Sequence, residues 1–322
     1  MFASKAQFRM APIQGSVALP PALRYALAMH EDEVEVDQGQ VSRLIAAQFP
    51  HWSNLPLWPA PSGGTDNVIF RLGADMAVRL PRRPSAAGQI VKEQRWLPEL
   101  ARHLPLPVPA PIGMGAPGEA FPFRWSVCRW LEGETALAAP IADLGQAAKD
   151  LASFVSALQR IDCAKGPGPG PHNSGRGEPL ARRDAETRMA IVKLAGMIDA
   201  GKATKVWETA LAAQVYEGEP TWLHGDLHPG NLITENGRLA AVIDFGCLGT
   251  GDPACDLMPA WTVLDAPARE TFRATHPVDD AAWARGRGWA LSMGLIALPY
   301  YLDTNPVLVA IARRAIAQAL MG

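Results

Sequence analysis

The sequence is poor in cysteine, and its four cysteines stand singly along 322 residues. None belongs to a Cys-x-x-Cys pair, the arrangement typical of zinc sites and disulfide-exchange centres. Cys247 and Cys255 are the only close pair, and they lack the further Cys or His that a zinc site requires. We therefore expect four reduced thiols and a cytoplasmic protein.

Long apolar runs are also missing. The most apolar late stretch, residues 289–302, is shorter than the roughly 20 residues that cross a bilayer, and it contains Pro299. Residues 1–28 lack the continuous apolar core of a secretory signal. We expect no membrane partner, and both Met1 and Met29 remain open as the translation start.

No excess of positive charge is present. The formal net charge is −2 and the isoelectric point is about 6.4. Proteins that bind nucleic acid usually carry a clustered basic face, so we expect no nucleic-acid partner. Nearly half of the residues are apolar, which is typical of a soluble globular protein, and we expect a monomer.

Periodicity divides the chain into two unequal parts after a loosely ordered extension over residues 1–35. Residues 36–131 alternate helix and strand, whereas residues 132–322 are mostly helical with one short β unit. Several prolines interrupt the first part, and Pro98 lies inside one of its predicted helices. The pattern predicts strands over 67–72, 76–80 and 123–131, and helices over 86–104, 147–161, 182–198, 203–216, 283–298 and 306–320.

The most informative segment is residues 221–257. Two short strands there flank Asn236-Gly237, a strong signal for a tight hairpin. Such a hairpin brings Asp226 and Asn231, which precede it, close to Asp244 at its end. An aspartate that receives a hydroxyl proton and two oxygen ligands for Mg²⁺ suit phosphoryl transfer, which depends on positioning and on charge neutralisation.

These residues lie in HGDLHPGN (224–231) and IDFG (243–246), followed by GDPACDL (251–257). The three motifs, in this order, closely resemble those of the aminoglycoside phosphotransferase family, a branch of the protein-kinase-like fold. The likeness extends over residues 36–320 and is closest to the 2″-aminoglycoside and macrolide branch. It implies an α+β, bilobal fold with a small, mixed β-sheet lobe at 36–131 that binds nucleotide and a larger helical lobe at 132–322.

The resemblance also implies a donor site for ATP or GTP with Mg²⁺. It gives Asp226 as the catalytic residue, with Asn231 and Asp244 as metal ligands. Arg79, paired with Glu93, stands where the family has lysine, and the two side chains are not equivalent toward phosphate. The remaining nucleotide contacts implied are the phosphate loop, Ser62, Gly63, Gly64 and Thr65, and two hinge residues, Cys128 and Trp130.

Four further residues of the segment have less direct roles. By the resemblance, Asp252 and Asp256 brace the catalytic loop. His224 and His228 are four residues apart, but the loop is not helical and no third ligand follows, so we interpret His224 as structural. A position of His228 near a second metal stays open.

The acceptor is the least defined element. The resemblance favours an aminoglycoside, and hence antibiotic resistance, but the chain beyond residue 250 has about as many arginines as acids. That balance leaves a macrolide open. A metabolic kinase for choline, homoserine or methylthioribose is a second alternative. A nucleotide-binding pseudokinase is a third, disfavoured because Asp226, Asn231 and Asp244 are all present.

Overall fold

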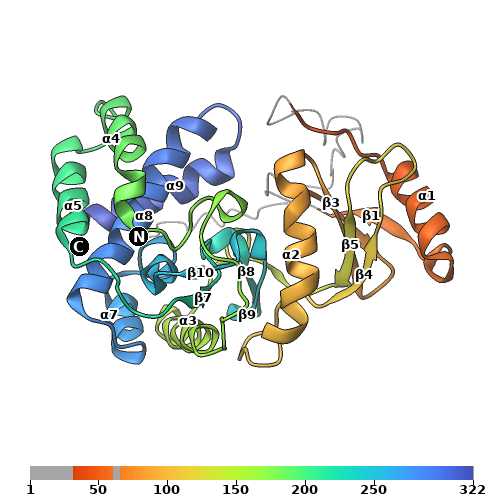
Figure 1. Cartoon of the computed structure of the whole chain (residues 1–322), viewed down its shortest axis with the longest axis horizontal. Coiled ribbons are helices and arrows are strands. Elements are labelled where there is room, and N and C mark those ends of the chain that lie inside the picture. Colours follow the sequence, from red (N-terminus) through yellow and green to blue (C-terminus); the bar gives the residue numbers. More distant parts are fainter. Residues whose placement is uncertain (1–31, 61–65, 322) are drawn as a thin grey trace, which may run out of the picture.

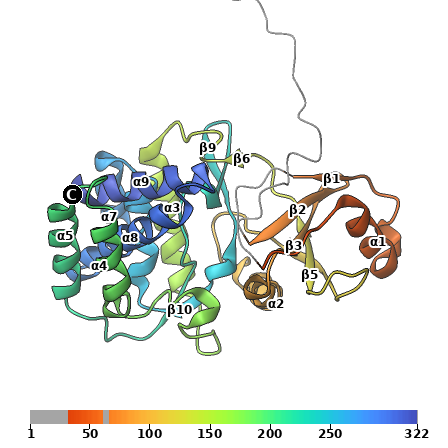
Figure 2. The ribbon, with the colours of Figure 1, turned by 90° about the horizontal axis from the view of Figure 1, so that it is seen from above.

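The structure is a computed structural model that describes residues 32–60 and 66–321. These residues form a five-stranded antiparallel sheet with two helices, followed by a largely helical part (Figure 1). The two parts lie side by side in both views (Figures 1 and 2). The chain passes from one to the other beyond β5, which ends at Arg129.

The sheet has the strand order β1-β2-β3-β5-β4. Its strands are β1 (Leu57–Pro59), β2 (Asn67–Leu72), β3 (Met76–Pro81), β4 (Pro111–Gly115) and β5 (Trp125–Arg129). Successive side chains of a strand point to opposite faces, so Val78 and Leu80 join one apolar core while Arg79 faces the other side.

Two helices cover the two faces of this sheet (Figure 1). Helix α1 (Gln38–Gln48) buries Val41 and Leu44 against the apolar face, and the Asp37 side chain caps its N-terminus. Helix α2 (Pro84–Leu100) lies on the face that carries Arg79. It ends earlier than predicted, and Pro98 falls in its last turn, where little helix remains to be interrupted.

The second part consists mainly of helices around a large apolar core. They are α3 (Leu144–Gln159), α4 (Asp184–Lys193), α5 (Ala200–Ala212), α6 (Pro259–Thr262), α7 (Ala266–Thr275), α8 (Asp280–Tyr301) and α9 (Pro306–Met321). All five helices predicted for this part are present. Helix α4 is shorter than predicted, because the chain turns after Lys193 through a segment that contains the weak helix former Gly196.

Helices α4 and α5 belong to an excursion whose two ends meet. The chain leaves at the end of α3 and returns in β7 (Thr221–Leu223). The Trp222 indole donates to the Asp162 carbonyl at 2.9 Å, and the Cys163 thiol donates to the Pro220 carbonyl at 2.8 Å. The whole helical pair is therefore held at its base by two hydrogen bonds.

The predicted hairpin is confirmed. Strands β8 (Leu232–Glu235) and β9 (Arg238–Val242) pair in antiparallel fashion, and Asn236 and Gly237 at the tip have φ of 51° and 74°. Both values are positive, as the tight turn requires. The other short elements are β6 (Glu134–Thr135), β10 (Gly249–Gly251), η2 (Pro50–Trp52), η3 (Pro171–Asn173), η4 (Leu180–Arg183), η5 (Pro229–Asn231), η6 (Phe245–Cys247) and η7 (Pro253–Leu257).

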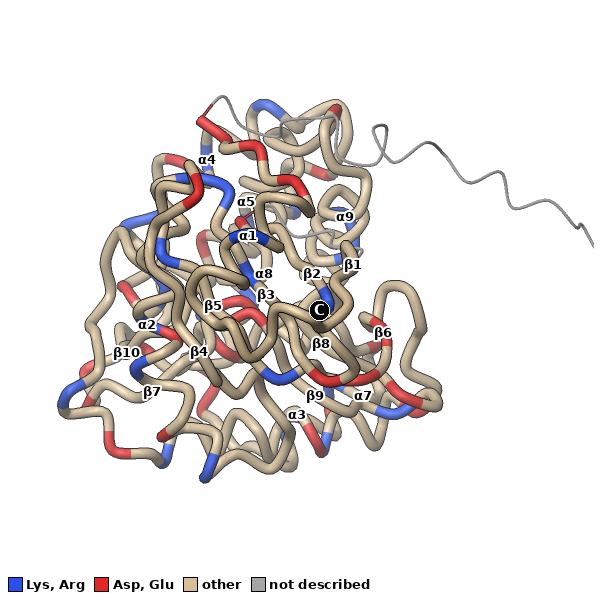
Figure 3. Tube along the Cα trace, turned by 90° about the vertical axis from the view of Figure 1, so that its right-hand side faces the viewer, with Lys and Arg blue, Asp and Glu red and all other residues tan. Residues whose placement is uncertain are grey.

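Acidic and basic positions are interspersed along the trace on the side shown in Figure 3. Among the described residues, no helix has both the length and the apolar character needed to cross a membrane.

Candidate active site

Asp226 and Asn231 lie together in the loop between β7 and β8. The Asn231 amide donates to the Asp226 carbonyl at 2.9 Å and to its carboxylate at 3.2 Å. In addition, the Ile243 backbone N–H donates to the Asn231 carbonyl at 2.9 Å, which ties the loop to the residue before Asp244. The structure therefore brings the three predicted residues to the same edge of the hairpin.

Two basic side chains, Arg176 and His228, contact the Asp226 carboxylate. The Arg176 guanidinium lies 3.5 Å from one oxygen, and the His228 Nε2 lies 3.4 Å from the other. Burial alone would raise the pKa of Asp226, but His228 and Arg176 outweigh that effect and hold the pKa well below its usual range. About a quarter of the side chain stays exposed, so the carboxylate is accessible to a ligand.

Asp256 binds the backbone at the junction between β7 and the loop that carries Asp226. Its two carboxylate oxygens accept hydrogen bonds from the backbone N–H groups of His224 at 2.6 Å and Gly225 at 2.7 Å. The carboxyl is fully buried, and burial raises its pKa to about 7 against the effect of these two donors. Gly225 has φ of 82°, and a Cβ there would lie 2.8 Å from the Cys247 carbonyl, so only glycine fits.

His224 links the loop to the end of β9. Its Nδ1 accepts from the Asp226 backbone N–H at 3.2 Å, and this assigns the ring proton to Nε2, which lies 3.0 Å from the Ile243 carbonyl. Burial lowers the pKa of His224, so the ring stays neutral. This structural role matches the interpretation of His224 made from the sequence.

Asp244 follows β9 at a backbone φ of 62°. Its carboxylate accepts from the Gly246 backbone N–H at 3.3 Å and lies 3.9 Å from the Arg79 guanidinium. More than a third of its side chain is exposed, so oxygen lone pairs remain available to a ligand. Arg79 thus connects the sheet to the hairpin edge.

Arg79 and Glu93 form the buried pair that the sequence predicted. The distance between Arg79 Nη1 and Glu93 Oε2 is 2.5 Å, and both residues are buried. Burial disfavours both charges, but Glu93 and Asp244 keep the pKa of Arg79 above its ordinary value. The guanidinium therefore stays charged between the two carboxylates.

The other predicted donor residues are placed less directly. Cys128 is buried on β5 opposite Ala77, and burial raises its pKa to about 11. The Trp130 ring packs under the Arg71 guanidinium, 4.8 Å from the ring centre. Both therefore stay predictions. The predicted phosphate loop, Ser62, Gly63, Gly64 and Thr65, lies outside the described residues.

The oxygen atoms at the hairpin edge suit a hard divalent cation only in part. Among residues 32–60 and 66–321, no group of three or more His, Cys, Asp or Glu could hold a metal ion. Asn231 and Asp244 offer two oxygen-bearing side chains. Mg²⁺ is commonly bound by one or two protein oxygens together with waters and phosphate oxygens, so the pair fits Mg²⁺ in the presence of a phosphate ligand.

Comparison with known families identifies the chain's relatives. A family model described as "Phosphotransferase enzyme family" matches residues 58–289, a range that contains every described residue of the site. The chain belongs to this family. It is a phosphotransferase. No curated protein matches the sequence.

Several solved structures resemble this phosphotransferase. The GDP and kanamycin complex of APH(2″)-IIIa has a TM-score of 0.67 at 18% identity, covering 87% of this chain and 97% of that chain. The GDP complex of wild-type aminoglycoside 2′-phosphotransferase-IIIa has a TM-score of 0.66 at 17% identity, covering 89% and 99%. Macrolide 2′-phosphotransferase MphH from Brachybacterium faecium has 0.59 at 24%, covering 85% and 96%. At these identities the likeness shows the fold, and it confirms the predicted α+β kinase-like architecture.

Arg176 was missed in the sequence. Its Nε donates to the Gly225 carbonyl at 2.7 Å while its Nη2 faces Asp226, so it binds both the backbone and the carboxylate of the phosphotransferase's central loop. It lies about 50 residues before Asp226, after the Gly-Pro repeat of residues 166–171, a composition typical of a loop. No local pattern could have pointed to it.

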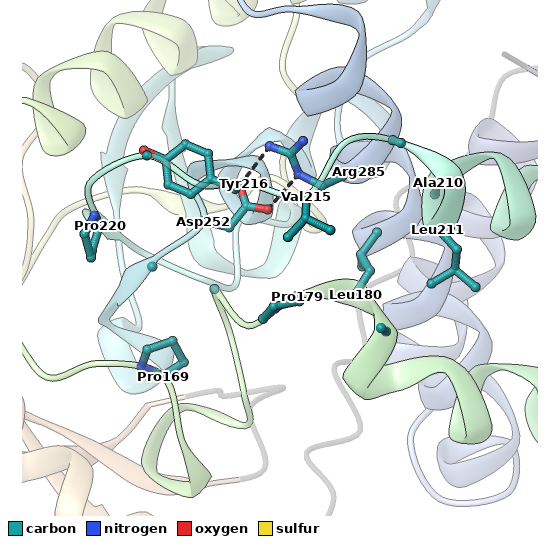
Figure 4. Close-up of a pocket in the computed structure, with 15 residues that line it drawn as sticks. Pro169, Pro179, Leu180, Ala210, Leu211, Val215, Tyr216, Pro220, Asp252 and Arg285 are labelled. Atoms are coloured by element: carbon teal, nitrogen blue, oxygen red, sulfur yellow. Dashed lines mark hydrogen bonds and ion pairs between the residues drawn. The ribbon is translucent and has the colours of Figure 1, made fainter.

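Asp252 braces a different part of the enzyme. It forms a buried ion pair with Arg285 of α8, at 2.8 Å, at the edge of a cavity of about 230 Å³ (Figure 4). Mostly apolar residues line the cavity, among them Leu180, Leu211 and Val215. None of the predicted nucleotide-binding, catalytic or metal residues lines this cavity. Asp252 therefore has an architectural role, but it braces α8 rather than the catalytic loop, which Asp256 holds.

Proposed function

We propose that this phosphotransferase moves the γ-phosphate of ATP or GTP onto a hydroxyl of a small antibiotic. The observation that carries the proposal is the meeting of Asp226, Asn231 and Asp244 at one hairpin edge, with the Arg79–Glu93 pair next to Asp244. GDP in two of the similar solved structures supports a nucleotide donor. The donor would lie between the lobe of residues 36–131 and the hairpin.

On the donor side, Arg79 would contact the phosphates and Glu93 would fix its orientation. Arginine keeps its charge and offers a planar set of donors to phosphate oxygens. Asn231 and Asp244 would hold Mg²⁺, which neutralises negative charge on the donor phosphates when bound. The buried ion pair keeps the Arg79 side chain in place before the nucleotide arrives.

On the acceptor side, Asp226 would accept a hydrogen bond from the hydroxyl and aim its oxygen at the phosphorus. Because its pKa is held low, Asp226 is a weak base, which suits a loose transition state in which the proton leaves late. Asn231 fixes the carboxylate by its hydrogen bond at 3.2 Å. The main contribution of Asp226 is therefore orientation.

An aminoglycoside is the first candidate acceptor, as the kanamycin complex of a similar structure supports. A specific observation favours a macrolide as the second. The cationic Arg176 contacts Asp226. Arg183 lies near Arg176, because both guanidinium groups face the Trp289 ring, at 5.9 Å for Arg176 and 5.2 Å for Arg183. Positive charge at this position repels a polycation more than a ligand with one amine.

The proposal is tested with purified enzyme, Mg²⁺ and ATP or GTP against a panel of aminoglycosides, macrolides, choline, homoserine and methylthioribose. Release of nucleoside diphosphate identifies the donor and the acceptor together. Asp226→Asn should lower kcat by about 10²–10⁴-fold and leave the nucleotide Kd within about threefold of wild type. Glu217→Gln, an exposed carboxylate outside the site, is the matched control. Full activity in Asp226→Asn would contradict the assigned role, and no transfer to any acceptor would favour a pseudokinase.

A further inference from the structure

Lys92 of helix α2 reaches out of the first part of the protein and binds the second. It directly precedes Glu93, the partner of Arg79. Its ammonium donates to the Gly246 carbonyl at 2.7 Å and to the His172 carbonyl at 3.1 Å. One side chain therefore joins α2, the loop after Asp244 and the 3-10 helix η3.

A third acceptor completes the coordination of this ammonium. The His172 Nδ1 lies 3.3 Å from Lys92 Nζ, and the His172 Nε2 lies 2.8 Å from the Gly168 carbonyl. Because a carbonyl can only accept, the ring proton is assigned to Nε2, and Nδ1 presents a lone pair to Lys92. All three N–H groups of the ammonium then have acceptors.

The residues that accept hydrogen bonds from Lys92 are connected to Asp244 on one side and to Asp226 on the other. Gly246 donates its N–H to the Asp244 carboxylate, so Lys92 and Asp244 bind the same residue from two sides. Next to His172, the Asn173 amide donates to the Arg176 carbonyl at 3.0 Å. Arg176 in turn contacts Asp226.

A second side chain of α2 lies against the same loop. A Cβ at Gly246 would lie 2.8 Å from Oε1 of Gln89, which is on α2 one turn before Lys92. Gln89 and Lys92 therefore both reach the loop after Asp244 from helix α2.

We propose that Lys92 is a positioning residue for the metal site: it keeps α2, and with it the Arg79–Glu93 pair, in register with Asp244. The inference rests on the proposed function, because it concerns the same donor site. Without the ammonium, α2 and the loop after Asp244 would be free to shift relative to each other. A displacement of about 1 Å at such a site costs roughly 10²-fold in rate.

The test uses the full chain with Mn²⁺ as the metal and ADP as the nucleotide. Lys92→Met keeps the length of the side chain and removes all three donors. Free Mn²⁺ is measured by electron paramagnetic resonance in the presence of ADP, and ADP binding without metal is measured by calorimetry. We expect the Mn²⁺ Kd to rise about 10–100-fold, as the loss of charged hydrogen bonds implies, and the metal-free ADP Kd to change less than about threefold.

Three further variants separate positioning from general stability. Arg95→Met removes a cation from an exposed position of the same helix and should leave the Mn²⁺ Kd unchanged. Lys92→Arg, which retains charged donors, should restore part of the Mn²⁺ affinity. His172→Ala removes one acceptor from an exposed residue, so it should fold normally and raise the Mn²⁺ Kd by a smaller factor in the same direction.

The outcomes distinguish this inference from the proposed function. Equal Mn²⁺ binding by wild type, Lys92→Met and His172→Ala would overturn the role of Lys92 and leave the proposed function intact. An equal loss of metal-free ADP binding and Mn²⁺ binding would also overturn it, because Lys92 would then support the whole nucleotide site. If wild type itself binds no Mn²⁺ with ADP, the proposed metal site fails, and this inference fails with it.

Discussion

Arg176→Met tests how the central loop is held. The substitution keeps an unbranched side chain of similar length and removes the guanidinium that donates to the Gly225 carbonyl at 2.7 Å and faces Asp226 at 3.5 Å. The buried carbonyl then has no donor, which costs about 1–3 kcal/mol. Loss of the nearby positive charge also lets the pKa of Asp226 rise toward its ordinary value.

Two measurements follow from these effects. A loss of about 2 kcal/mol corresponds to a fall in Tm of roughly 3 °C for a chain of 322 residues. Because Gly225 precedes Asp226, a shift of this backbone moves the carboxylate, and kcat should fall about 100-fold. Thermal unfolding measures Tm. Release of nucleoside diphosphate, with an accepted substrate and Mg²⁺, measures kcat.

The matched control is Arg182→Met, which removes an exposed guanidinium from the same excursion. It should leave both Tm and kcat near their wild-type values. The reasoning would be refuted if Arg176→Met kept the wild-type kcat, or if Arg182→Met lost as much activity as Arg176→Met.

Three other predictions concern buried polar groups. Arg79→Met leaves the Glu93 carboxylate buried without its partner and should cost about 3–5 kcal/mol in urea unfolding, whereas Arg79→Lys should retain most of that stability; equal losses would contradict the pairing argument. Asp256→Asn can accept only one of two backbone donors, so it should cost about 1–3 kcal/mol and lower kcat, and an unchanged variant would show that the brace is dispensable. Burial and Arg160 lower the pKa of His276 from 6.5, so the unfolded chain takes up its proton first as the pH falls. Stability should therefore decline below about pH 6.5, and His276→Gln should flatten the dependence of Tm on pH; an equal slope in both proteins would disprove the assignment.

The parts of the site that could be predicted are those encoded by local structure. Asp226, Asn231 and Asp244 lie within one short stretch, and the Asn-Gly turn between the strands determines that the ends of the stretch meet. The Arg79–Glu93 pair joins a strand to the helix that follows it, so its geometry is also nearly local.

Arg176 and Lys92 could not be predicted because their contacts depend on the closure of the whole fold. Lys92 binds Gly246, which lies 154 positions further along the chain, and Arg176 binds a loop that follows two intervening helices. Neither residue lies in a pattern with a recognisable period or spacing. Helix boundaries were also hard to predict. The sequence pattern predicted that α2 ends at residue 104, whereas the helix ends at Leu100.

The closed base of the α4–α5 excursion makes it an exchangeable unit. Because the Trp222 indole and the Cys163 thiol hold its two ends together, a helical pair of another length grafted between residues 163 and 220 would leave β7 where it is. The length of the α4–α5 helices can thus change without moving β7. Every replacement segment has to supply its own donor to the Gly225 carbonyl, the bond that Arg176 makes now. It also has to supply acceptors for Lys92, as His172 does, and an apolar side chain for the core in place of Trp207.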